Sequence, residues 1–207
     1  MNWGILMGDK NNSIGEVASV EGDVIEVFVY PEKFHKVRVG SILLIDSEYV
    51  KPMGVVLKLS HSSRYGSFTP LRQTRSEIDA AYPDLKNYHK FVTSVAYTSV
   101  LDDETVRHFR KSMPLLHDLV YIIEDEDLLE RFMKPEGDWD FRFLEYFVKA
   151  GATHVEIREF FLNHLDFFKK RVGEFEDIVQ SITRYLGRRS FDALQIVIEE
   201  FEEALRI

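Results

Sequence analysis

Through the first hundred residues, short apolar runs alternate with turn-forming residues at a spacing typical of β-structure. The runs are rich in β-branched and aromatic side chains, so each of them predicts a strand. The predicted strands are Ser13–Val20, Asp23–Tyr30, Lys36–Asp46, Pro52–Leu59 and Phe91–Val100. Gly40, inside the third strand, indicates a bulge or a sharp bend. We expect these strands to form a small closed barrel, because closure removes exposed strand edges.

Two helices and one more strand are predicted around the last of these strands. Residues 60–76 are rich in serine, glycine and proline and predict a loop. The other elements are a short helix over Ser76–Tyr82, a helix from Asp102 or Asp103 to about Ser112, and a strand over Leu119–Ile123. Glu124–Asp127 then predicts the first turn of a helix that ends near Met133, since acids are favourable at the positive end of the helix dipole.

Beyond Lys134–Gly137, which we interpret as a linker, the apolar period becomes helical. Gly151 predicts a left-handed helix end, and Thr153 with Glu156 has the spacing of a capping box. The predicted helices cover Asp138–Ala150, Thr153 to about Arg171, the segment between Gly173 and Gly187, and a last helix capped by Ser190 that carries Leu194, Ile198, Phe201 and Leu205. The expected fold is therefore α+β, with a barrel domain at 1–133 and an α-helical bundle domain at 138–207.

Charge is distributed unevenly along the 207 residues. The net charge is −9, and residues 1–100 contribute nothing to it, with 11 Lys/Arg against 11 Asp/Glu. The acidic second half therefore argues against a broad nucleic-acid surface there, and we interpret it as a solvated helical surface.

The absence of cysteine excludes disulfides and thiolate chemistry. Together with the many Lys, Arg and Glu residues, it is compatible with a heat-adapted source. No apolar run reaches the roughly 20 residues of a membrane helix, and Met1–Lys10 lacks the basic start and the cleavage site of a signal peptide. We expect a cytoplasmic protein.

One stretch could bind nucleic acid. From Tyr49 to Ser76 the chain has five cations and no acid, together with Tyr65 and Phe68. Cations beside aromatic rings can contact phosphates and stack on bases. The candidate contacts are Lys58, Arg64, Tyr65, Arg72 and Arg75. The simpler alternative is a surface loop whose charges pair with acids elsewhere in the protein.

Catalytic, cofactor and metal motifs are missing from the sequence. There is no G-x-x-x-x-G-K-[ST] phosphate loop, no dinucleotide fingerprint and no nucleophile elbow. His154 and His164 lie ten residues apart, which does not match the helical spacing of a metal site. We therefore assign no catalytic, cofactor-binding or metal-binding residue, and a site built from scattered side chains near residue 134 stays open as a further alternative.

The barrel strands resemble a known family. Ile14–Val17, Val39–Ile45 and Met53–Val56 are similar to the HAS-barrel, the N-terminal barrel of HerA-type DNA-translocating ATPases. Tyr82–Leu85 and Met113–Ile122 look like the stretch that links this barrel to the motor. The missing phosphate loop departs from that family, so the resemblance implies a barrel without its ATPase.

The resemblance implies a non-catalytic oligomerisation or docking protein. It would act as an accessory factor in HerA-type DNA processing or repair, form a homo-oligomer, and bind a HerA-like ATPase or a NurA-like nuclease. A nucleic-acid-binding module that uses the basic loop of residues 49–76 is the first alternative.

Overall fold

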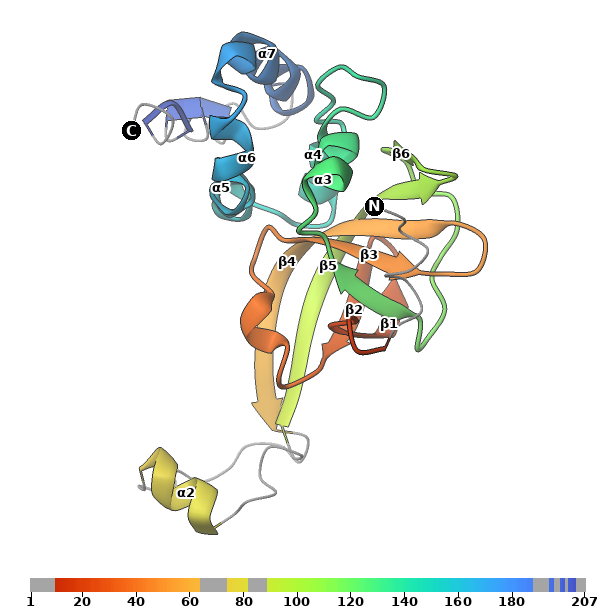
Figure 1. Cartoon of the computed structure of the whole chain (residues 1–207), viewed down its shortest axis with the longest axis vertical. Coiled ribbons are helices and arrows are strands. Elements are labelled where there is room, and N and C mark those ends of the chain that lie inside the picture. The colour runs from red at the N-terminus through yellow and green to blue at the C-terminus, as the bar shows by residue number, and fades with distance from the viewer. Residues whose placement is uncertain are drawn as a thin grey trace.

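The barrel predicted from the strand pattern is present in the structure. The computed structural model describes residues 10–63, 74–81, 89–187, 194–195, 198–199 and 201–203. Six antiparallel strands form the barrel, and pairing of β2 with β5 closes it (Figure 1). The strands are β1 (Gly15–Glu21), β2 (Val24–Val29), β3 (Ile42–Asp46), β4 (Lys51–Ser63), β5 (His89–Asp102) and β7 (Leu119–Ile122). A short strand, β6 (Thr105–Arg107), pairs with the end of β5.

The inside and the outside of the barrel are both apolar where helices cover it. Leu43 and Ile45 of β3 join a buried cluster to which all six barrel strands contribute. Ile42 and Leu44, on the opposite face of the same strand, join the cluster formed by the helices. Burial of both faces explains why β3 is a continuous apolar run rather than an alternating one.

The helix predicted from Asp102 or Asp103 to Ser112 is wrong. Strand β5 continues to Asp102, and the pairing of Asp102 with Thr105 leaves a two-residue hairpin loop. Asp103 and Glu104 have φ values of 45° and 70°, which is the left-handed conformation that such loops require. The aspartates that resemble a helix cap thus form a hairpin turn, and Val106 of the returning strand is buried.

The other helices follow the predicted order, but the one helix predicted from Thr153 to about Arg171 is divided into two at His164. The helices are α2 (Arg75–Ala81), α3 (Glu126–Met133), α4 (Phe143–Lys149), α5 (His154–Asn163), α6 (Leu165–Lys169) and α7 (Phe175–Leu186), with 3-10 turns η1 (Phe34–Lys36) and η3 (Val172–Glu174). The capping box at Thr153 and Glu156 is confirmed, and Gly151 has a φ of 106°. The start of the last helix, at Ser190, lies outside the described residues.

The first helix of the C-terminal half begins five residues later than predicted, at Phe143 instead of Asp138. The Ser181 hydroxyl donates to the Trp139 carbonyl at 2.9 Å and accepts from the Phe141 amide at 3.3 Å. Backbone groups that bond to a side chain of α7 do not need helical partners. The segment before Phe143 is therefore not helical.

The hydrophobic core is continuous between the barrel and the helices. A single cluster joins Met53 and Val55 of β4 to Phe143 of α4 and Phe160 of α5, and Phe201 of the last helix lies in it as well. The division into domains at residues 133 and 138 and the bundle arrangement of the helices remain predictions.

Candidate functional site

The most prominent exposed apolar feature is a loop between β6 and β7. Leu115 and Leu116 are 66% and 60% exposed, and Met113 next to them is 53% exposed. We call residues 112–118 the leucine turn. Large apolar side chains that stay in solvent next to one another are typical of surfaces that bind another molecule.

The backbone of the leucine turn is held at several points. The Asp118 carboxylate accepts from the Leu115 amide at 2.8 Å, and the Asp118 amide donates to the Leu115 carbonyl at 3.2 Å. His117 has a φ of 70° and its amide donates to the Val17 carbonyl at 3.0 Å. At the start of the turn, the Tyr97 hydroxyl donates to the Ser112 carbonyl at 2.7 Å. The exposed leucines therefore project from a fixed backbone.

An exposed aromatic residue lies in a loop that is hydrogen-bonded to this turn. The Ser47 hydroxyl, in the loop between β3 and β4, donates to the same Asp118 carboxylate. Tyr49, two residues further along, is 84% exposed. Asp118 thus ties together two loops that both present apolar surface at one end of the barrel.

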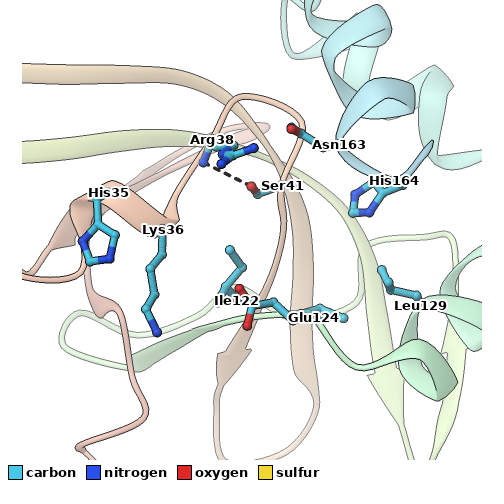
Figure 2. Close-up of a pocket in the computed structure, with 10 residues that line it drawn as sticks. His35, Lys36, Arg38, Ser41, Ile122, Glu124, Leu129, Asn163 and His164 are labelled. Atoms are coloured by element: carbon cyan, nitrogen blue, oxygen red, sulfur yellow. Dashed lines mark hydrogen bonds between the residues drawn. The ribbon is translucent and has the colours of Figure 1, made fainter. Parts of the chain in front are cut away.

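A groove lies where the barrel meets α3 and α5 (Figure 2). It has a volume of about 450 Å³, and we call it the basic groove. Its lining residues are His35, Lys36, Arg38, Ser41, Ile122, Ile123, Glu124, Leu129, Asn163 and His164. A smaller cavity of about 220 Å³ shares Lys36 and Ile122–Glu124 with it and adds Lys33.

Gly40 shapes the end of the basic groove that faces the helices. Its φ is 83°, and a Cβ there would lie 2.5 Å from the Phe160 Cα atom. The Asn163 amide donates to the Val39 carbonyl, and His164 Nε2 lies 3.3 Å from the Gly40 oxygen. Since a carbonyl can only accept, His164 carries its proton on Nε2. Gly40 thus forms a sharp bend before β3, not a bulge within it.

The wall of the groove next to η1 is cationic. His35, Lys36 and Arg38 are exposed, and none of them forms an ion pair with a carboxylate among the described residues. Glu124 is the acid that faces them across the groove. Burial lowers the pKa of His164 to about 4, so that side chain is neutral at pH 7. The groove therefore presents hydrogen-bond donors on the wall next to η1 and the carboxylate of Glu124, a hydrogen-bond acceptor, across from them.

A polar cavity also lies next to Lys134–Gly137, where the sequence leaves an enzyme site open. It has a volume of about 340 Å³ and is lined by Arg142, Arg184 and Tyr185 among others. His108, also in the lining, bonds through Nδ1 to the Ser99 hydroxyl at 2.8 Å. Ser99 is fully buried and does not line the cavity, so a substrate bound there would not reach the serine hydroxyl.

The predicted nucleic-acid contacts are described only in part. Lys58 lies on β4 and is exposed, and Arg75 is the first residue of α2. Arg64, Tyr65 and Arg72 lie outside the described residues. Of the five candidates, the structure thus locates only Lys58 and Arg75, and the predicted contact site stays a prediction.

Residues 58–63 of β4 pair with residues 89–94 of β5, and we call these two segments the β4–β5 ribbon; β2 also pairs with residues 92–94. In Figure 1 the ribbon points away from helices α3–α7. It contains no acid. The ammonium group of Lys90 lies 4.9 Å from the ring centre of Phe28, which is 44% exposed. Sequence reasoning did not single out this cation–π pair, because its partners are distant in the chain.

The acidic segment Glu124–Asp127 begins a helix, as predicted. Asp125 is the N-cap of α3 and accepts from the Leu128 amide at 3.0 Å. Glu126 instead pairs with Lys170 at 2.6 Å and with Arg171 at 3.3 Å. These two cations thus bind α3.

Comparison of the sequence with protein-family models and with curated proteins finds no match in either set. Among the described helices, none is long and apolar enough to cross a membrane.

Proposed function

We propose that this protein is a non-catalytic docking module that binds a protein partner through the leucine turn. The observation that carries the proposal is that Leu115 and Leu116 are exposed on a backbone that hydrogen bonds hold in place. A fixed loop loses little conformational freedom on binding, so burial of its apolar side chains contributes more to affinity.

The resemblance of Met113–Ile122 to the barrel-to-motor segment of HerA proteins supports the choice of partner. We propose a HerA-like ATPase or a NurA-like nuclease, with this chain as an accessory factor in DNA processing or repair. Tyr49 widens the apolar surface, and aromatic residues are enriched where protein interfaces are strongest. Self-association of the barrel into a homo-oligomer would use the same kind of surface.

The test is a double substitution, Leu115→Ser with Leu116→Ser. Biolayer interferometry against a HerA-like ATPase and a NurA-like nuclease from the same organism should show binding by the wild type that the double variant weakens by at least tenfold, roughly the effect of one interface hot spot. Val172→Ser is the matched control, because Val172 is 50% exposed and lies in η3, outside the turn.

Light scattering of the same proteins reports self-association. A wild type that binds neither partner and stays monomeric would contradict the proposal, as would equal binding by the double variant and the wild type.

Nucleic-acid binding is the second candidate, and the acid-free β4–β5 ribbon favours it. Lys58 and Lys90 supply charge there, and Phe28 supplies an exposed ring. Contacts of this kind weaken steeply with salt. The test is titration of the protein with a fluorescent single-stranded oligonucleotide at two salt concentrations. Binding that weakens at the higher salt concentration would support nucleic-acid binding over protein docking.

A further inference from the structure

Two histidines meet on the β4–β5 ribbon although they lie 28 positions apart in the chain. His61 pairs with Phe91, and His89 pairs with Ser63, two residues further along β4. Side chains two residues apart on a strand share one face, so His61 and His89 are diagonal neighbours across the ribbon. His61 Nε2 and His89 Nδ1 are 2.7 Å apart, and the ring centres are 4.7 Å apart.

The ring of His61 is held in position by an aromatic stack. The ring centres of His61 and Phe91 are 4.3 Å apart, with an interplanar angle of 10°. The ring centres of Phe91 and Phe34 are 4.8 Å apart. This stack fixes the plane of the imidazole and directs the edge that bears Nε2 toward His89. His61 is exposed, so water and ions can reach the pair.

The two facing nitrogens can both become metal ligands. A neutral imidazole carries one proton and one lone pair, and here one ring donates to the other. With the protons on His61 Nδ1 and His89 Nε2, both facing nitrogens offer lone pairs. This needs a change of tautomer in one ring and a small rotation of the His89 ring, which turns the two lone pairs away from each other and toward one ion.

The separation of the nitrogens indicates which metals fit. Two nitrogens about 2.0 Å from an ion lie about 2.8 Å apart when they occupy neighbouring corners of a square-planar or tetragonal site, and about 3.3 Å apart in a tetrahedral site. The observed 2.7 Å is close to the first value. Cu²⁺ and Ni²⁺ prefer the tetragonal geometry, whereas Zn²⁺ prefers the tetrahedral one.

We propose that His61 and His89 form a two-histidine site for Cu²⁺ or Ni²⁺ at the outer part of the β4–β5 ribbon. Among the described residues no group of three or more metal-ligating side chains occurs, so His61 and His89 are the protein ligands proposed here. The order of affinity is Cu²⁺ above Ni²⁺, with Zn²⁺ also below Cu²⁺. This site is independent of the docking function.

The test is calorimetric titration of the intact chain with Cu²⁺, Ni²⁺ and Zn²⁺, together with electron paramagnetic resonance of the Cu²⁺ form. We expect one Cu²⁺ per chain with a signal typical of two nitrogen ligands. His61→Ala and His89→Ala should each weaken Cu²⁺ binding by at least tenfold. His35→Ala is the matched control, because His35 is exposed and lies on η1, and it should leave the affinity unchanged.

Circular dichroism of each variant checks that it is folded before titration. Wild-type binding that both alanine variants retain would assign the ion to another group. No binding by the wild type at millimolar Cu²⁺ would show that the two rings form a hydrogen bond only. Either result overturns the proposal.

Discussion

Gly40 shows how a single residue decides where the barrel and the helices meet. Its left-handed φ of 83° is one that other residues adopt only at a cost, and its Cα atom lies close to the backbone of α5. The missing side chain allows Asn163 and His164 to reach the carbonyl groups of Val39 and Gly40. The basic groove depends on this close approach.

Replacement of Gly40 by alanine should lower the free energy of unfolding by about 3 kcal/mol or more, because backbone strain and a backbone clash add together. Urea unfolding followed by circular dichroism measures the change. Gly137→Ala, at a φ of 91° with nothing near the added Cβ, should cost about 1 kcal/mol. Gly173→Ala, with open space, should stay within about 0.5 kcal/mol of the wild type. Equal effects at Gly40 and Gly137 would show that the contact with α5 contributes nothing.

At the scale of elements, strand β5 connects the barrel interior to the leucine turn. Tyr97 is buried inside the barrel, and its hydroxyl donates to the Ser112 carbonyl and accepts from the Lys111 amide at 3.3 Å. Burial raises the pKa of Tyr97, so the hydroxyl keeps its proton and remains a donor. A residue of the barrel core thus holds the start of a loop that has no regular secondary structure.

Tyr97→Phe should loosen the leucine turn while the barrel stays folded. The loss of two hydrogen bonds should cost about 1–2 kcal/mol of stability. Hydrogen exchange measured by mass spectrometry should become faster in peptides that cover Lys111–Leu116, and binding to the docking partner should weaken. Tyr185→Phe, on α7, is the control and should leave exchange in that segment unchanged. Unaltered exchange in Tyr97→Phe would mean that the other bonds of the turn suffice to hold it.

At the scale of the whole molecule, two neutral histidines are buried within the barrel–helix assembly. His164 lies against Gly40. The ring centre of His108 lies 5.2 Å from that of Phe132 and 5.4 Å from that of Phe143. Burial lowers the pKa of each to about 4, well below the usual value of 6.5. The unfolded chain therefore binds protons more readily than the folded chain between pH 6.5 and 4, and stability must fall as the pH falls through this range.

Between pH 7 and 5 the free energy of unfolding should fall by about 2 kcal/mol for each of these histidines. Urea unfolding at pH 7, 6 and 5 measures this loss above the range in which most carboxylates titrate. His164→Gln keeps an amide that can donate to the Gly40 carbonyl but cannot titrate, so it should remove about half of the pH dependence. A variant with the same pH dependence as the wild type would assign the effect to other groups.

Local signals in the sequence determined much of the architecture. The β-branched runs within Asp23–Tyr30 and Leu119–Ile123 predict strands that the structure contains as β2 and β7, and Thr153 with Glu156 predicts a helix start. These predictions hold because strand patterns and helix caps depend on residues that are close in the chain. Closure of the barrel follows as well, since short strands that repeat need a way to remove their edges.

Tertiary structure decided where the chain departs from its local signals and where side chains meet. Ser181, forty residues from Phe141, keeps the segment before Phe143 out of the helix, and burial of Val106 favours a hairpin over the predicted helix. Likewise, strand register brings His61 to His89, and the turn at Gly40 brings Asn163 to the barrel. Each of these outcomes depends on contacts between residues that are distant in the chain, whereas propensities and periodic patterns describe only near neighbours.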